Sequence, residues 1–160
     1  MLENQLILLA EDDPSDVLLI QRSFRKAGLR EVLKLVHDGE QAIQYLGGRG
    51  VYSNRERFPL PFMLLLDLKM PGADGFDVLE WVRAQREFNR LLIVVLTSSN
   101  LQSDVDKAYE LGANSYLVKP VEFTDMVNLI KRFEAYWTEM NRIPTFPSAG
   151  KVARAEPALD

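Results

Sequence analysis

Five side chains that can bind metal or phosphate each come directly after a short apolar run: Glu11, Asp12, Asp67, Thr97 and Lys119. Carboxylates that share a small space repel one another and raise one another's pKa, so a converging group of them needs a compensating cation. Oxygen ligands without histidine or cysteine select Mg²⁺, with Mn²⁺ as a substitute. Convergence of the three acids would therefore create a magnesium site.

Asp67 is the candidate nucleophile of this set. It precedes the segment 68–72, a turn rich in proline and glycine that places the carboxylate at a mouth rather than in a core. Such a carboxylate accepts a phosphoryl group as an acyl phosphate when a metal and a cation neutralise the incoming charge. Lys119 is the candidate cation. Thr97 can hydrogen-bond a phosphoryl oxygen, although taken alone it is equally a strand-end threonine.

Helix capping is the alternative explanation for part of the acidic cluster. Asp13, Pro14 and Asp16 match an N-cap, a proline at the first helical position and an acid in the first turn. Capping is the preferred role for Asp13, whereas Glu11 and Asp12 lie before the cap and favour metal binding. An exposed or helix-flanking role is preferred for His37, the only histidine, so a phosphodonor histidine is expected on another protein.

Alternating strands and helices are predicted to position these residues. Apolar runs predict strands at 6–10, 32–36, 62–66, 91–96 and 116–118. Three of them are apolar at nearly every position, as strands buried on both faces of a parallel sheet require. Apolar stripes predict helices near 17–27, 39–46, 75–86, 101–111 and 123–138. Right-handed crossovers then give an α/β, doubly wound, five-stranded parallel sheet of order 2-1-3-4-5, with the site residues at its carboxyl edge.

Length and composition predict one domain over residues 1–138. Residues 139–160 form a C-terminal tail too short for an output domain, and Gly47 to Pro61 is expected to be an exposed loop. The net charge of −4, without a run of basic residues, argues against nucleic-acid binding. The first residues lack a signal-peptide pattern and the apolar runs are too short for a membrane span, so we expect a cytoplasmic protein.

Four separated motifs resemble the receiver domain of two-component response regulators: Glu11-Asp12, 66–71 with Gly75, Thr97-Ser98, and 116–120. The resemblance implies the flavodoxin-like (βα)5 receiver fold and phosphorylation of Asp67 by a histidine kinase. It also implies that Mg²⁺ is held by Glu11, Asp12, Asp67 and the backbone carbonyl of Lys69. It implies that Thr97 and Lys119 bind the phosphoryl group and that Thr97 and Tyr116 are the switch residues. It also implies that the Lys119–Pro120 peptide is often cis.

Single-domain regulators that partner bacterial phytochromes and related histidine kinases are the members that the chain most resembles. The features concerned are the 47–61 loop, Lys69 and the aromatic end of the last helix. This resemblance implies a signalling switch that catalyses only its own phosphotransfer and dephosphorylation, and that signals through the face of helix 4, strand 5 and helix 5. Glu11 departs from the usual aspartate pair and lengthens one arm of the metal site.

A homodimer through that same face is predicted from an excess of apolar residues. The stripe that packs the last helix on its own sheet comprises Phe123, Met126, Val127, Ile130, Phe133 and Trp137. Tyr136, Met140, Ile143 and Phe146 are left over, and a two-fold contact would bury them. The same patch could instead bind a kinase.

Two other protein classes fit parts of the pattern less well. A phosphohydrolase of the haloacid dehalogenase type needs a second acid two residues after its nucleophile, where this chain has Lys69. A flavodoxin-like cofactor domain needs hydroxyls and amides in its first loop, where Glu11, Asp12 and Asp13 would repel a phosphate.

Overall fold

A single parallel sheet forms the centre of the computed structural model, which describes residues 5–30 and 32–145. Its strands are β1 (Ile7–Ala10), β2 (Leu33–Val36), β3 (Met63–Leu66), β4 (Leu92–Thr97) and β5 (Ser115–Val118). They lie in the order β2-β1-β3-β4-β5, and every pair is parallel. The predicted fold class and strand order are therefore confirmed.

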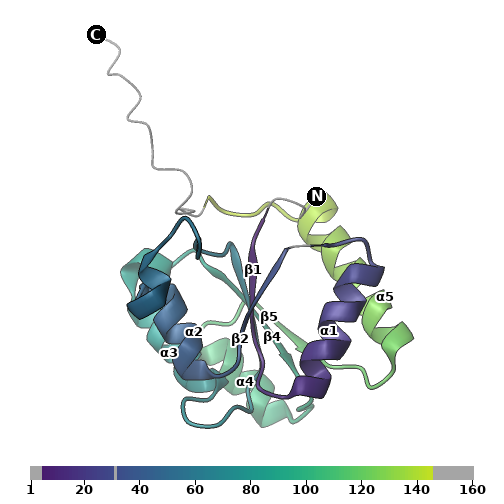
Figure 1. Cartoon of the computed structure of the whole chain (residues 1–160). Coiled ribbons are helices and arrows are strands. Elements are labelled where there is room, and N and C mark those ends of the chain that lie inside the picture. The colour runs from purple at the N-terminus through teal and green to yellow at the C-terminus, as the bar shows by residue number, and fades with distance from the viewer. Residues whose placement is uncertain (1–4, 31, 146–160) are drawn as a thin grey trace.

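Helices cover both faces of this sheet (Figure 1). They are α1 (Pro14–Lys26), α2 (Gly39–Gly47), α3 (Gly75–Ala84), α4 (Gln102–Glu110) and α5 (Phe123–Ala135). Short 3-10 turns occupy Gly50–Ser53 and Arg86–Phe88, and a π-helical turn, Tyr136–Met140, extends α5. α1 and α5 pack on one face, and α2, α3 and α4 pack on the other.

The side chains of β1 show how one strand supplies two cores. Ile7 and Leu9 join the cluster beneath α1 and α5, whereas Leu8 and Ala10 join the cluster on the opposite face. Alternate side chains of a strand point to opposite faces, so a strand buried on both sides must be apolar throughout. This packing fixes the sheet rigidly and holds its carboxyl edge in place.

The start of α1 confirms the capping role of Asp13. Its carboxylate accepts hydrogen bonds from the backbone N–H groups of Ser15, at 2.8 Å, and Asp16, at 3.1 Å, with Pro14 at the first helical position. The Asp13 carboxylate is thus engaged by the helix. Glu11 and Asp12 remain as the acids of this loop that can face the rest of the carboxyl edge.

Gly75 allows the start of α3 to touch the backbone of the nucleophile segment. A Cβ at this position would lie 2.3 Å from the carbonyl oxygen of Asp67 and 2.7 Å from the Cα of Leu68. No larger residue fits without moving the helix or the strand end. The glycine of the sequence motif therefore has a packing role that fixes the backbone around Asp67.

The segment 47–61 is exposed over much of its length, as the sequence predicted, but part of it packs on the domain. The rings of Tyr52 and Phe58 pack against each other at 5.1 Å and against the core residue Tyr45. Arg55 donates hydrogen bonds to the carbonyl oxygens of Tyr45 and Leu46, each at 2.7 Å, and so caps the end of α2. This part of the segment is held against the domain, because Arg55 supplies the donors that the carbonyl groups at the end of α2 need.

Two details of the predicted apolar surface, one at the start of α5 and one beyond its end, are corrected by the structure. Phe123 is 41% exposed instead of packing fully on its own sheet. Ile143 is half-buried and packs on the core beneath α1 and α5, so it is not left over. Tyr136 and Met140 are exposed as predicted, and Phe146 lies outside the described residues.

Two further findings concern the chain as a whole. No cis peptide bond occurs within residues 5–30 and 32–145. The Lys119–Pro120 bond is therefore trans, whereas the resemblance implied a bond that is often cis. Among these same residues, no helix is both long and apolar enough to cross a membrane.

Candidate functional site

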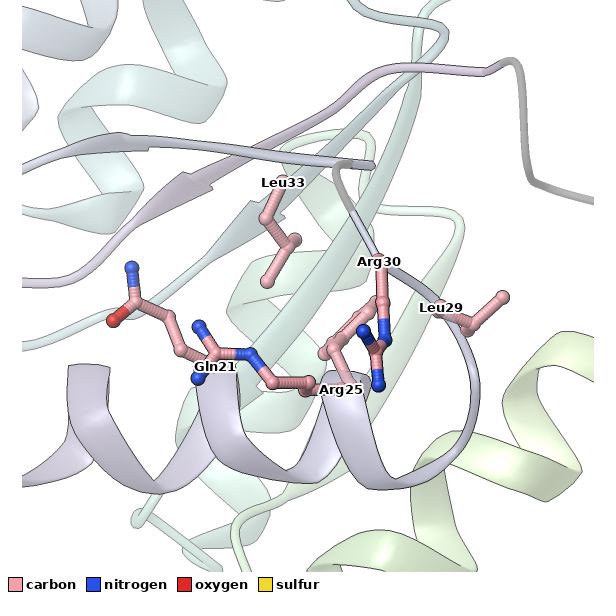
Figure 2. Close-up of a pocket in the computed structure, with 6 residues that line it drawn as sticks. Gln21, Arg25, Leu29, Arg30 and Leu33 are labelled. Carbon is pink, nitrogen blue, oxygen red and sulfur yellow. The ribbon is translucent and has the colours of Figure 1, made fainter.

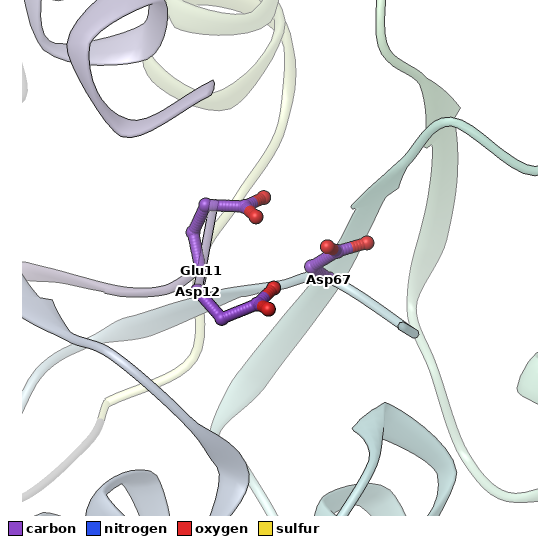
Figure 3. A group of neighbouring side chains, drawn as sticks. All are labelled: Glu11, Asp12 and Asp67. Atoms are coloured by element: carbon purple, nitrogen blue, oxygen red, sulfur yellow. The ribbon is translucent and has the colours of Figure 1, made fainter. Parts of the chain in front are cut away.

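Three acidic side chains converge at the carboxyl edge of β1 and β3. Glu11, Asp12 and Asp67 each present a carboxylate oxygen within 4.8 Å of the others (Figure 3). The register explains this convergence, because Ala10 of β1 pairs with Leu66 of β3 and the acids follow directly. The backbone N–H of Asp67 also donates to the carbonyl of Ala10 at 3.1 Å.

The three oxygens have the chemistry and the spacing of a divalent-cation site. Magnesium binds carboxylate oxygens at about 2.1 Å, so two ligands of one octahedral ion are about 3.0 Å apart when adjacent and about 4.2 Å apart when opposite. The three oxygens lie within 4.8 Å of one another, a limit close to the larger of these distances. Glu11 and Asp67 are buried, and Asp12 is half-buried.

Lys119 places its ammonium group among the carboxylates. It follows β5 and hydrogen-bonds to Glu11 and to Asp16, the latter at 3.0 Å, with Asp67 at 3.3 Å. Only 5% of its side chain is exposed. Buried charges need partners because desolvation is costly, and these ion pairs provide them.

Burial shifts the pKa of both central groups, Glu11 and Lys119, and their mutual hydrogen bond opposes that shift in each. Burial and the nearby Asp67 charge raise the pKa of Glu11 to about 7, even though the hydrogen bond from Lys119 lowers it. Burial alone lowers the pKa of Lys119, but the hydrogen bond to Glu11 and the Asp67 charge outweigh it, so this pKa lies above its usual value. Lys119 is therefore held in its charged form by the carboxylates around it.

Two buried oxygens at this edge have no hydrogen-bond partner within the described ranges: Oδ1 of Asp67 and Oγ1 of Thr97. Buried polar atoms are normally paired, and unpaired ones cost free energy. Thr97 ends β4, the strand next to β3, and it is fully buried. Two unpartnered buried oxygens on neighbouring strand ends are the main structural sign of a ligand site.

A hydrogen-bonded chain leads from this edge to Tyr116. The Tyr116 hydroxyl donates to the carbonyl oxygen of Ser99 at 2.9 Å, and the Ser99 hydroxyl bonds the carboxylate of Asp104 at the start of α4. Burial raises the pKa of Tyr116, as do the Asp104 and Asp67 charges. Tyr116 is thus tied to the loop that joins Thr97 to α4.

The remaining candidates have simpler surroundings. Lys69 lies in the turn two residues after Asp67 and is exposed. His37 is also exposed, as predicted, and its backbone N–H donates to the side chain of Gln41. Asp16 is the contact that the sequence did not predict, because its position in the chain indicated only a first-turn helix acid.

A hollow of about 350 Å³ at the other end of α1 is a separate feature (Figure 2). It is lined by Gln21, Phe24, Arg25, Leu29, Arg30 and Leu33. Leu33 begins β2, so this hollow lies at the amino edge of the sheet, away from the acidic cluster. It has no carboxylate among its lining residues and does not contribute to the site.

Known proteins share this fold and the surrounding sequence. A family model for the response regulator receiver domain matches residues 7–131. A probable methanogenesis regulatory protein, FilR2 of Methanothrix harundinacea, is 35% identical over 87% of both chains. Response regulator Rcp1 of Synechocystis is 34% identical over 88% of this chain and 93% of its own.

Solved structures extend the comparison to ligands. The Mn²⁺-bound form of Rcp1 matches 88% of this chain and 99% of its own with a TM-score of 0.77 and 33% identity. A phosphorylated cyanobacterial phytochrome response regulator, RcpA, covers the same shares with a TM-score of 0.79 and 30% identity. The similarity thus includes one protein solved with a divalent metal and one solved in a phosphorylated state.

Proposed function

Because the chain belongs to the response regulator receiver family, we propose that it is a two-component switch phosphorylated on Asp67 by a histidine kinase. The observation that carries this proposal is the pair of unpartnered buried oxygens on Asp67 and Thr97, beside the ammonium group of Lys119. A phosphoryl group on Asp67 would bring acceptor oxygens to the Thr97 hydroxyl and the Lys119 ammonium.

The residues that take part in the transfer all lie at this edge of the sheet. A carboxylate oxygen of Asp67 attacks the phosphorus of a phosphohistidine, the P–N bond breaks as the P–O bond forms, and the imidazole keeps the electron pair. Lys119 balances charge on the phosphoryl oxygens, and Thr97 donates a hydrogen bond to one of them. Attack by water later releases phosphate and restores the carboxylate. The protein changes only its own state and turns over no outside substrate.

Mg²⁺ is the proposed cofactor, with Mn²⁺ able to replace it. Glu11, Asp12 and Asp67 would hold the ion, together with the backbone carbonyl of Lys69. When bound, the ion neutralises negative charge on the phosphoryl oxygens during transfer. The oxygen-only ligand set and the Mn²⁺-bound form of the relative Rcp1 support this assignment.

Acetyl phosphate provides the direct test. We expect purified protein to gain one phosphoryl group from acetyl phosphate when Mg²⁺ is present and none when EDTA removes the metal, measured by intact-protein mass spectrometry. A protein that gains no phosphoryl group with Mg²⁺ would contradict the proposal.

The partner that we propose is a histidine kinase of the bacterial phytochrome class or a related one. Support comes from RcpA, whose structure is described as that of a phytochrome response regulator. The exposed His37 lies outside the acidic site, so the phosphodonor histidine belongs to another protein. A kinase charged from ATP acts where ATP is found, so the proposal includes a cytoplasmic location.

Phosphorylation is expected to change the face formed by α4, β5 and α5. The phosphoryl group would draw Thr97 toward Asp67, and Tyr116 would follow because its hydroxyl is bonded to the loop after Thr97. For this change, the phosphoryl group must favour one of two packings of the α4, β5 and α5 face by a few kcal/mol. We therefore expect trifluoroberyllate, an acyl-phosphate mimic, to shift the amide NMR signals of Tyr116 and of residues 101–111. Unchanged signals there, with shifts confined to the residues around Asp67, would refute this coupling.

A homodimer through the same face is the proposed form of assembly. Tyr136 is 48% exposed and lines a groove of about 290 Å³ between β5 and α5, and Met140 is 76% exposed at the end of the π-helical turn that begins at Tyr136. An isologous contact would remove this apolar surface from water. We expect sedimentation at micromolar concentration to show a dimer that Met140→Glu converts to a monomer.

A matched control for the dimer is Val51→Glu, since Val51 is 71% exposed but lies on the 3-10 turn after α2. This variant should remain dimeric. If the unmodified protein is strictly monomeric both with and without trifluoroberyllate, the dimer is excluded and the surface is left for another protein.

A further inference from the structure

The ammonium group of Lys119 is hydrogen-bonded to two carboxylates, and neither of them belongs to the nucleophile. Its partners are Glu11 and Asp16, whereas Asp67 lies at 3.3 Å as an ion pair without a hydrogen bond. Asp16 comes from the first turn of α1, 103 positions earlier in the chain than Lys119. The hydrogen bonds of Lys119 therefore draw its ammonium group toward Glu11 and Asp16 rather than toward Asp67, whose phosphoryl group it would bind.

Charge balance makes this arrangement consequential. One ammonium group stands among the carboxylates of Glu11, Asp12, Asp16 and Asp67. An ammonium group has three N–H donors, and two of them are used by Glu11 and Asp16. A phosphoryl group on Asp67 adds further negative charge and needs Lys119 as a partner. The phosphoryl group, Glu11 and Asp16 would then compete for the position of this one ammonium group.

Solvent exposure decides which contact is given up more easily. The Glu11 side chain is 1% exposed, so water cannot readily take the place of Lys119 there. The Asp16 side chain is 37% exposed, so water can replace Lys119 there at small cost. Asp16 is thus suited to hold the lysine in the resting state and to release it.

We propose that Asp16 is a positioning residue that competes with the phosphoryl group on Asp67 for Lys119. In the resting protein it draws the ammonium group toward α1, and in the phosphorylated protein it returns to water as Lys119 turns to the phosphoryl oxygens. This inference rests on the proposed phosphorylation of Asp67. It adds a residue of α1 that sets how strongly the site holds its phosphoryl group.

Binding of trifluoroberyllate at saturating Mg²⁺, measured by titration calorimetry and ¹⁹F NMR, tests the competition. We expect Asp16→Asn to bind the mimic about threefold to fivefold more tightly than the wild type, as removal of a competing exposed ion pair allows. Asp16→Glu keeps the charge and should bind like the wild type. Asp125→Asn is the matched control, because Asp125 is an exposed acid in the first turn of α5.

Each alternative outcome is distinct. A merely structural role for Asp16 would lower the thermal stability of Asp16→Asn and leave its binding unchanged or weaker, which would overturn the inference. Equal tightening in Asp125→Asn or in Asp16→Glu would overturn it too, because the specific ion pair would not then be the cause. A wild type that fails to bind the mimic would overturn the proposed function together with this inference, whereas wild-type binding without tightening in Asp16→Asn overturns the inference alone.

Discussion

Replacing Asp67 with asparagine is expected to abolish phosphorylation by acetyl phosphate. Asparagine has nearly the same shape as aspartate, but its amide has no carboxylate oxygen able to form an acyl phosphate. The neighbouring groups remain in place, with Lys119 still bonded to Glu11 and Asp16. Intact-protein mass spectrometry should therefore show complete phosphorylation of the wild type and none of Asp67→Asn under the same conditions.

Loss of the reaction in this variant should not come from unfolding. The variant removes one of several carboxylates from a buried cluster, so less like-charge repulsion remains and thermal stability should be equal to or above that of the wild type. Asp125→Asn makes the same chemical change at an exposed position and should be phosphorylated normally. If Asp67→Asn still gains the full phosphoryl mass, the nucleophile has been assigned to the wrong residue.

The predictable parts of this protein are those that local sequence patterns determine. β1, β3 and β4 are apolar at nearly every position because both of their faces are buried, and that pattern is visible without a structure. The strand order then follows from the connection rules, and it places Glu11, Asp12 and Asp67 together. Convergence of the acidic cluster could therefore be predicted from the positions at which two strands, β1 and β3, end.

The unpredicted parts depend on contacts between distant segments. Asp16 meets Lys119 because α1 and β5 are brought together by the packing of α1 against α5, which no local pattern encodes. Arg55 was similarly unpredictable as a cap, since its partners are the free carbonyls at the end of α2. Ile143 packs on the core for the same kind of reason, which reduces the apolar surface predicted for the dimer.

The metal ligands can be tested separately from the nucleophile through Asp12. Its side chain reaches the acidic cluster, and within the described part of the chain it makes no hydrogen bond or ion pair that its removal would break. Asp12→Ala therefore removes a proposed ligand at little structural cost. We expect it to weaken Mg²⁺ binding by about tenfold to a hundredfold, measured by titration calorimetry on unphosphorylated protein.

The neighbouring Asp13 provides the control for this effect. Asp13→Asn removes a carboxylate next to the site but keeps the helix cap, because asparagine is an equally good N-cap residue. Its Mg²⁺ affinity should fall only slightly, through the loss of long-range attraction between exposed charges. Normal Mg²⁺ binding by Asp12→Ala would exclude Asp12 as a ligand. An equally large loss in Asp13→Asn would mean that the total negative charge, rather than coordination by Asp12, governs the affinity.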